Sequence, residues 1–193
     1  MIYLASNSPR RAELLQQIEC SFIQVSGDIE EVAEEWEQAI DYVQRLARQK
    51  AQQGLKNVQY NKLALHPVLG ADTIVVIDNV VLEKPKDEDD ARKMMLMLSA
   101  HTHSVYTAIA LADEKKIETA LVVSKVTFKT LCDDEISAYW KTGEPQGKAG
   151  GYAIQGTGAK FISHLDGSYS AVMGLPLFET SELITHFKET PCL

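Results

Sequence analysis

The sequence lacks the features that mark secreted, membrane-spanning and zinc-binding proteins. Its three cysteines, Cys20, Cys132 and Cys192, are odd in number and form no Cys-x-x-Cys pair, which argues against a disulfide framework or a zinc site. The apolar run after Met1 ends at Ser6 and is too short for a signal peptide. No run approaches the roughly 18 apolar residues of a membrane span. We therefore expect a cytoplasmic protein with no membrane partner.

Basic residues are fewer than acidic residues. The formal net charge is −8, so the global field repels nucleic acid, and a polyanionic ligand would need a local basic pocket. Neither a Walker lysine loop nor a Gly-x-Gly-x-x-Gly turn occurs, which removes the two commonest nucleotide-binding signatures. Hydrophobic residues make up 45% and charged residues 24% of the chain, which predicts one ordered domain over residues 1–193.

Apolar runs and helical stripes in alternation predict an α/β protein with a curved mixed sheet. The expected strands cover residues 2–5, 68–77, 80–82, 105–112 and 121–131. The expected helices begin after Ser8, near residues 38, 87 and 133, and at Pro176. We expect Gly54 to end the second helix and Asp166-Gly167 to turn a hairpin. Six of the eleven glycines fall within residues 143–158, so this glycine-rich segment either turns sharply or approaches a ligand.

Two arginines stand at the start of the first predicted helix. The pair Ser8-Pro9 is typical of an N-cap followed by proline at the first helical position, which places Arg10 and Arg11 in the first turn. The helix macrodipole disfavours cations there, and a bound anion would reverse that cost. Together with the hydroxyls of Ser6 and Ser8, the two guanidinium groups predict a phosphate site. The alternative is a capped helix with solvated arginines.

Charged residues also interrupt two apolar patterns. Asp72 lies inside the apolar run 68–77, where a carboxylate needs a partner. It is a candidate general base or metal ligand, unless backbone donors satisfy it at a strand bend. Lys50 falls on the apolar stripe of the second helix, and Lys84 stands at a strand end. Each lysine taken alone is explained by snorkelling towards solvent.

Further acids and two histidines need a separate interpretation. Glu30, Glu31 and Glu83 are ordinary surface residues when taken singly, but three carboxylates near a triphosphate would form an oxygen site for Mg²⁺. His101 and His103 stand two positions apart, as residues on one face of a strand do, but no third ligand stands at a suitable spacing. We therefore treat both histidines as non-catalytic.

Five blocks of the sequence together resemble the Maf family of nucleotide pyrophosphatases. They are Leu4-Ala5-Ser6-Asn7-Ser8-Pro9-Arg10-Arg11, Leu69-Gly70-Ala71-Asp72-Thr73, Glu83-Lys84-Pro85, Lys148-Ala149-Gly150-Gly151-Tyr152-Ala153-Ile154-Gln155-Gly156 and Gly174-Leu175-Pro176. The blocks stand in the family's order and spacing over almost the whole chain. The resemblance implies a two-lobed α/β fold related to the inosine triphosphate pyrophosphatases. It also implies helices around a curved mixed β-sheet, a central cleft for the nucleotide, and a homodimer.

The resemblance also implies roles for individual residues. The catalytic and phosphate-contacting set becomes Ser6, Arg10, Arg11, Glu31, Lys50, Asp72 and Lys84, with Asp72 as the proton acceptor. Ser8 and Glu83 join the expected substrate contacts, and Glu31 and Asp72 are expected to hold Mg²⁺ or Mn²⁺. The combination of Arg10, Thr73 and Gln155 resembles the dTTP/UTP subgroup. Gly151 and Ala153 depart from the usual pattern, which has alanine and glycine there, and bear on the shape of the base pocket.

The implied activity is hydrolysis of dTTP and UTP, or of modified pyrimidine nucleotides, to the monophosphate and pyrophosphate. Water would attack the α-phosphorus, and cations would meet the charge that grows on the leaving pyrophosphate. The Gln155 amide would read the O4 and N3–H edge of the base if Thr73 holds it. The alternative is a nucleotide-sensing regulator of cell division and septum formation without turnover. A purely structural α/β module leaves the two arginines unexplained.

Overall fold

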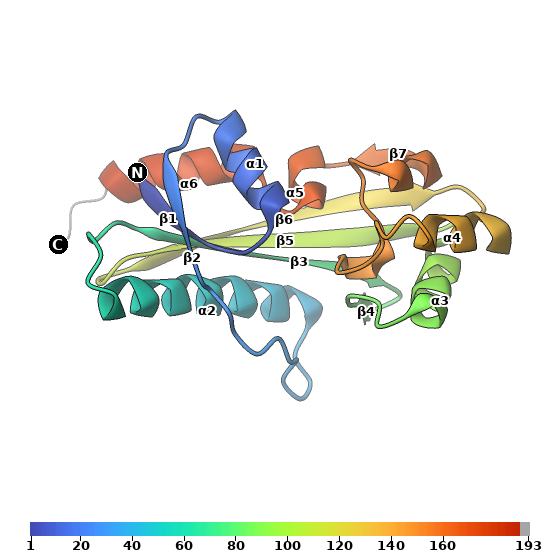
Figure 1. Cartoon of the computed structure of the whole chain (residues 1–193), viewed down its shortest axis with the longest axis horizontal. Coiled ribbons are helices and arrows are strands. Elements are labelled where there is room, and N and C mark those ends of the chain that lie inside the picture. Colours follow the sequence, from blue (N-terminus) through green and yellow to red (C-terminus); the bar gives the residue numbers. More distant parts are fainter. Residues whose placement is uncertain (190–193) are drawn as a thin grey trace. The chain divides into compact units, whose positions relative to one another are not determined.

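The protein is described by a computed structural model that covers residues 1–189 and contains a seven-stranded mixed β-sheet (Figure 1). The strands are β1 (Ile2–Ala5), β2 (Phe22–Val25), β3 (Val68–Ile77), β4 (Val80–Leu82), β5 (Thr102–Ala112), β6 (Ile117–Phe128) and β7 (Ile162–Asp166). The α-helices in the described part of the chain are α1 (Pro9–Gln17), α2 (Ala39–Tyr60), α3 (Glu88–Leu98), α4 (Asp133–Trp140), α5 (Tyr169–Met173) and α6 (Leu177–Glu189), and the short 3-10 helices are η1 (Ala149–Gly151) and η2 (Thr157–Phe161). Cys192 lies outside the described residues.

The sheet has the strand order β2-β1-β3-β5-β6-β7, and β4 pairs with β3. Strand β1 runs parallel to β2 and β3, whereas β3 with β4 and β6 with β7 are antiparallel. Parallel neighbours need crossover connections, and α1 and α2 supply them. The predicted α/β class with a mixed sheet is therefore confirmed, and the central cleft stays a prediction.

The chain forms two compact units. Unit 1 comprises residues 1–72 and 107–122 and the described residues from Gly174 onward, and unit 2 comprises residues 73–106 and 123–173. The strands β3, β5 and β6 contribute residues to both units. The expectation of a single domain over the whole chain stays a prediction.

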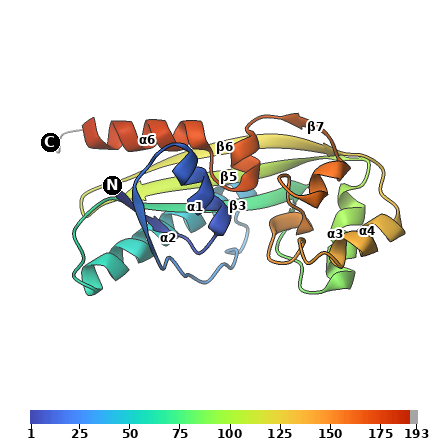
Figure 2. The same cartoon turned by 45° about the horizontal axis from the view of Figure 1, so that its top comes forward.

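In unit 1, α2 lies on one face of the sheet, and α1 and α6 lie on the other (Figures 1 and 2). The prediction that Gly54 ends the helix is wrong, because α2 continues to Tyr60. A Cβ atom at Gly54 would lie 2.7 Å from the Ala5 Cβ and 2.7 Å from the Val68 Cγ1. Glycine is therefore needed inside this helix for close packing on β1 and β3, and not as a stop signal.

The buried stripe of α2 begins later than the sequence predicts. Val43, Leu46 and Ala47 are buried as expected, but Ile40 in the first turn is 42% exposed. Lys50 continues the stripe and is only 8% exposed. The helical period thus places a lysine side chain among buried residues.

Unit 2 has its own hydrophobic core between the sheet and the helices α3 and α4. Its largest fully buried members are Met95, Leu98, Phe128, Tyr139 and Phe161. The predicted strands 68–77 and 80–82 are confirmed as β3 and β4, which form an antiparallel hairpin, and both turn residues, Asp78 and Asn79, adopt positive φ angles of 49° and 63°. Aspartate and asparagine tolerate this left-handed backbone better than most residues, which suits them to a tight hairpin turn.

The hairpin predicted at Asp166-Gly167 is wrong. After β7 the chain enters α5 instead of a returning strand. Gly167 has a φ of 131°, and a Cβ atom there would lie 2.6 Å from the Ser124 Oγ. The glycine therefore allows close backbone approach to β6 and a change of direction, which the dipeptide pattern does not distinguish from a hairpin turn.

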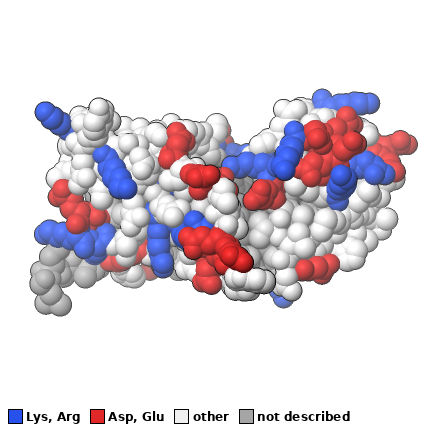
Figure 3. Space-filling view, turned by 90° about the horizontal axis from the view of Figure 1, so that it is seen from below, with Lys and Arg blue, Asp and Glu red and all other residues white. Residues whose placement is uncertain are grey.

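No helix in residues 1–189 is long and apolar enough to cross a lipid bilayer. On the face drawn in Figure 3, lysine and arginine side chains are interspersed with aspartate and glutamate. The lack of a membrane or nucleic acid partner stays a prediction.

Candidate functional site

The N-terminus of α1 in unit 1 is the first candidate site for contact with phosphate. Ser8 is the N-cap residue and Pro9 the first helical residue, as predicted, although the Ser8 side chain makes no capping hydrogen bond. The buried Ser6 hydroxyl accepts a hydrogen bond from the Ser8 amide at 3.2 Å and another from the Arg11 Nη1 at 3.3 Å. The structure therefore brings Ser6, Ser8 and Arg11 together at one helix end.

Arg11 has a fixed position at this helix end. Its Nε donates a hydrogen bond to the Gly174 carbonyl at 2.8 Å. Burial lowers the pKa of the Arg11 guanidinium, and the carboxylates of Asp72 and Glu31 oppose that effect. Burial likewise lowers the pKa of Arg10, which Glu13 partly offsets. Two partly desolvated guanidinium groups at a helix N-terminus favour an anionic ligand, as the sequence indicates.

Lys50 joins the two predicted carboxylates of unit 1. Its Nζ donates hydrogen bonds to Asp72 Oδ1 and to Glu31 Oε1, each at 2.5 Å. Asp72 is only 6% exposed and Lys50 only 8% exposed. Snorkelling towards solvent therefore does not explain Lys50, and Asp72 has a side-chain cation as partner. A buried carboxylate with such a partner is the arrangement expected of a residue with a chemical role, although ion pairs also occur as structural elements.

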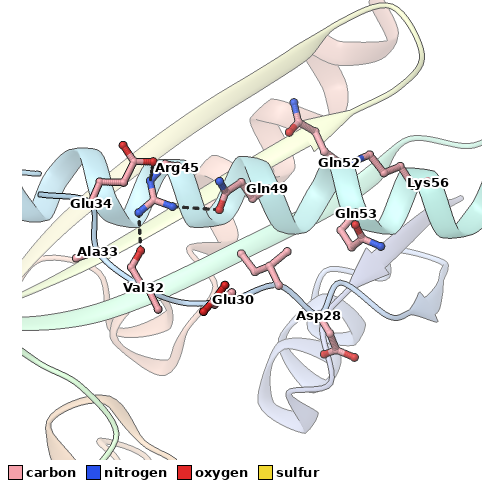
Figure 4. Close-up of a pocket in the computed structure, with 11 residues that line it drawn as sticks. Asp28, Glu30, Val32, Ala33, Glu34, Arg45, Gln49, Gln52, Gln53 and Lys56 are labelled. Atoms are coloured by element: carbon pink, nitrogen blue, oxygen red, sulfur yellow. Dashed lines mark hydrogen bonds and ion pairs between the residues drawn. The ribbon is translucent and has the colours of Figure 1, made fainter.

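Glu31 belongs to the loop between β2 and α2, and Arg45 fastens this loop to α2 (Figure 4). The Arg45 Nη2 donates to the Val32 carbonyl at 2.9 Å, and its Nη1 donates to Gln49 Oε1 at 3.2 Å. Its Nε lies 3.5 Å from Glu34 Oε1. Arg45 thus fixes the backbone next to Glu31, which reaches Lys50 from this loop.

The loop and the outer side of α2 enclose a polar pocket of about 640 Å³ (Figure 4). Glu30 lines this pocket, whereas Glu31, Lys50 and Asp72 do not. Glu30 is exposed, and its part in an oxygen site for a metal ion stays a prediction.

The remaining predicted residues lie in unit 2. Thr73 follows Asp72 on β3 and is half-buried. Glu83 and Lys84 follow β4 and are exposed, and the Glu83 carbonyl accepts a hydrogen bond from the Gly150 amide at 3.0 Å. The exposed Gln155 lies in the same glycine-rich segment as Gly150. The structure therefore links the segment after β4 to the glycine-rich segment.

Comparison with known proteins agrees with the motif pattern. A family model described as "Maf-like protein" matches residues 1–187. The chain belongs to the Maf family. Among curated Maf relatives, the dTTP/UTP pyrophosphatase of Aliivibrio fischeri is 53% identical over 186 residues, which are 96% of this chain and 97% of that protein. Proteins of the same name from Photobacterium profundum and Salmonella typhimurium are also 53% identical, over 96% of this chain and 96% and 92% of their own lengths.

The donor set of this Maf chain fits a divalent metal ion in type. Glu31 and Asp72 each accept a hydrogen bond from the Lys50 ammonium group, so the two carboxylates are close enough to share a cation. Mg²⁺ is usually bound through one or two carboxylates and substrate phosphates, with water completing its shell. Within residues 1–189, no group of three or more histidine, cysteine, aspartate or glutamate side chains is arranged to hold a metal by itself. Metal binding in this Maf protein would therefore depend on the substrate phosphates.

Sequence reasoning missed two residues that fix the segments carrying the predicted residues Glu31 and Gln155. Arg45 carries no local signal for its contact with the loop, because its loop partners Val32 and Glu37 precede α2 and are not at helical spacing. Glu144 stands in the glycine-rich segment next to Pro145, where a carboxylate is unremarkable. The available signal was the concentration of glycines around Gln155, of which Gly156 and Gly158 pack against Glu144 and Tyr139.

Proposed function

We propose that this Maf-family chain hydrolyses dTTP and UTP to the nucleoside monophosphate and pyrophosphate. The observation that carries the chemistry is the buried Asp72 paired with Lys50, with the Arg11 guanidinium charge close enough to act on the same carboxylate. The similarity to dTTP/UTP pyrophosphatases over nearly the whole chain supports the choice of substrate. Modified pyrimidine nucleotides belong to the same substrate class.

In the proposed reaction, water attacks the α-phosphorus and pyrophosphate leaves. Asp72 accepts the proton of the water, while the Lys50 ammonium, at 2.5 Å, fixes the orientation of its carboxylate. Arg10, Arg11 and Lys84 carry the positive charge that stabilises the phosphate oxygens as charge spreads over them. The hydroxyls of Ser6 and Ser8 and the helix amides contact the phosphates.

We further propose that the enzyme uses Mg²⁺ or Mn²⁺. Glu31 and Asp72 would hold the ion. When bound, it would offset the negative charge on the phosphate oxygens and polarise the phosphorus–oxygen bonds at the α-phosphate. Activity should appear with Mg²⁺ or Mn²⁺, disappear with a chelator, and return when the metal is added back. Full activity in a metal-free, chelator-treated sample would contradict this part of the proposal.

Gln155 is the proposed reader of the base. Its amide offers a donor and an acceptor that suit the N3–H and O4 edge of thymine and uracil. The Thr73 side chain and the exposed Glu83 complete the proposed substrate contacts. An extra methyl group changes affinity by only about 1 to 3 kcal/mol, so dTTP and UTP should both be substrates.

The decisive experiment assays pyrophosphate release from a panel of nucleoside triphosphates in ¹⁸O-labelled water. We expect dTTP and UTP to be the best substrates, with the label in the monophosphate because water attacks the α-phosphorus. Orthophosphate as the first product would indicate attack at the γ-phosphorus and a different enzyme class. Tight binding of triphosphates without turnover would favour a nucleotide-sensing regulator. The homodimer and the cytoplasmic location stay predictions that size measurement and fractionation test.

A further inference from the structure

The Glu144 carboxylate forms hydrogen bonds with backbone amides that follow Gln155 in unit 2. It accepts hydrogen bonds from the Thr157 amide at 2.8 Å and from the Gly158 amide at 3.0 Å. It also accepts a hydrogen bond from the hydroxyl of Tyr139, in the last turn of α4, at 2.7 Å. One carboxylate therefore joins a helix side chain to two successive backbone amides.

Tyr139 forms a hydrogen bond with a backbone amide that precedes Gln155. Its hydroxyl oxygen accepts a hydrogen bond from the Ala153 amide at 3.1 Å. Gln155 lies between Ala153 and Thr157 in the sequence, and its own side chain is exposed. The backbone on both sides of Gln155, which we call the Gln155 segment (residues 153–158), is thus fixed by one connected pair of side chains.

Tyr139 and Glu144 leave no room for a side chain at two positions of the Gln155 segment. A Cβ atom at Gly156 would collide with the carboxylate of Glu144. A Cβ atom at Gly158 would lie 2.6 Å from the Tyr139 hydroxyl oxygen. The backbone therefore packs directly against the two oxygen-bearing groups, which only glycine permits. These glycines bring the backbone to protein acceptors, and their presence does not require a ligand at the same place.

The charge state of the pair makes its hydrogen bonds strong. Burial raises the pKa of the Tyr139 hydroxyl, and the neighbouring carboxylate raises it further, so this group donates its proton at neutral pH. Burial also raises the pKa of Glu144, but hydrogen bonds from Tyr139, Gly158 and Thr157 outweigh that effect and leave it below its ordinary value. Hydrogen bonds to an ionised acceptor are roughly twice as strong as neutral ones.

We propose that Tyr139 and Glu144 are positioning residues for base selection, because they hold the Gln155 segment so that the Gln155 amide meets the base in one orientation. This inference rests on the proposed role of Gln155. On a loose backbone, Gln155 can bring its amide to a base in several positions, so it selects weakly. With the backbone fixed on both sides, the amide is presented at one position, and a base whose edge does not match there leaves a hydrogen bond unmade.

The test measures a selectivity ratio, defined as kcat/KM for dTTP divided by kcat/KM for GTP. We expect Tyr139→Phe, which removes one donor and one acceptor, to lower this ratio roughly tenfold. The matched control is Tyr152→Phe, which also removes a buried hydroxyl hydrogen bond, at 2.8 Å to His103 Nε2, but no contact with the Gln155 segment amides. Its ratio should stay within about twofold of the wild type. A uniform loss on both nucleotides in Tyr139→Phe would show a merely structural role and overturn the inference.

A double-mutant cycle separates this inference from the proposed role of Gln155. Gln155→Ala should lower the ratio, and adding Tyr139→Phe should then lower it no further, because both changes remove the same discrimination. A drop in Gln155→Ala with an unchanged ratio in Tyr139→Phe would overturn the positioning role and leave base reading intact. An unchanged ratio in both variants would overturn base reading by Gln155, and the inference with it.

Glu144→Gln provides a second variant with a direct structural readout. Its amide group donates where the carboxylate accepted, so one backbone amide loses its partner. We expect faster hydrogen exchange at the amides of Thr157 and Gly158 in the folded full-length protein, together with a lower selectivity ratio. Faster exchange with an unchanged ratio would overturn the inference even if Tyr139→Phe failed to fold.

Discussion

The Lys50 ammonium donates a hydrogen bond of 2.5 Å to Asp72 Oδ1, although the two residues stand 22 positions apart in the sequence. The contact joins the buried face of α2 to the interior of β3. It helps to orient the carboxylate, as the proposed proton-acceptor role requires.

The first prediction concerns the Asp72 carboxylate. Asp72→Asn is nearly isosteric, and its amide oxygen still accepts from Lys50, so the fold should persist. We expect kcat for dTTP to fall by about 10² to 10⁴ because the amide accepts no proton. The control is Asp78→Asn, an exposed turn residue with a φ of 49°, which should keep its activity. Activity of Asp72→Asn within about threefold of wild type would exclude the proton-acceptor role.

The second prediction concerns the loop that carries Glu31. Arg45→Met removes the hydrogen bonds to Val32, Glu37 and Gln49, and we expect faster amide exchange across residues 28–37. Loss of a fixed Glu31 should lower kcat/KM roughly ten- to hundredfold, because small displacements at a reacting centre are costly.

The matched control for the loop is Arg48→Met on the same helix. Arg48 is exposed, and its Nη2 lies 3.4 Å from Thr119 Oγ1, away from the loop. This variant should change neither exchange at residues 28–37 nor turnover. If Arg45→Met loosens the loop without any loss of kcat/KM, the reaction does not depend on a fixed Glu31.

The third prediction concerns stability in mild acid. His103 in unit 2 is buried, its Nδ1 has no hydrogen-bond partner among the described residues, and burial lowers its pKa to about 4. Between this value and the ordinary pKa of about 6.5, the unfolded chain binds a proton that the folded chain does not. The free energy of unfolding should therefore decrease as the pH falls through this window, by at most about 1.4 kcal/mol per pH unit for this one proton.

Urea unfolding from pH 7.5 to pH 4.5 checks the His103 effect by comparison of variants. His103→Gln should show a shallower decrease in unfolding free energy than the wild type, because the glutamine does not titrate. His164→Gln, which alters an exposed histidine of β7, should follow the wild-type curve. Identical slopes in all three proteins would mean that His103 titrates in the same way in the folded and unfolded chains.

The fourth prediction concerns the glycine inside α2. Alanine favours a helix over glycine by about 1 kcal/mol, but a Cβ atom at Gly54 would lie 2.7 Å from both Ala5 Cβ and Val68 Cγ1. We expect Gly54→Ala to lower the unfolding free energy by about 1 to 3 kcal/mol through overpacking. Gln52→Ala, at an exposed position of the same helix, should change it by less than about 0.5 kcal/mol. A more stable Gly54→Ala would show that α2 can move away from the sheet at no cost.

The local patterns of the sequence were sufficient for most elements. Apolar periodicity placed Val43, Leu46 and Lys50 on one helical face, and Ser8-Pro9 marked the start of α1. Both signals depend on residues within one or two turns of each other, which the backbone geometry alone brings together. Gly54 and Gly167 were misread because a glycine that ends or turns a chain looks the same in sequence as one that allows close packing.

The ordered motif blocks and the apolar patterns are enough to recognise the α/β class, the Maf family and the candidate residues. The partners of those residues depend on the three-dimensional fold. It placed Lys50 between Asp72 and Glu31, fastened the Glu31 loop through Arg45, and set Glu144 against the Gln155 segment. Such pairs join segments distant in the chain, so their identity depends on strand order and helix packing, which no local spacing encodes.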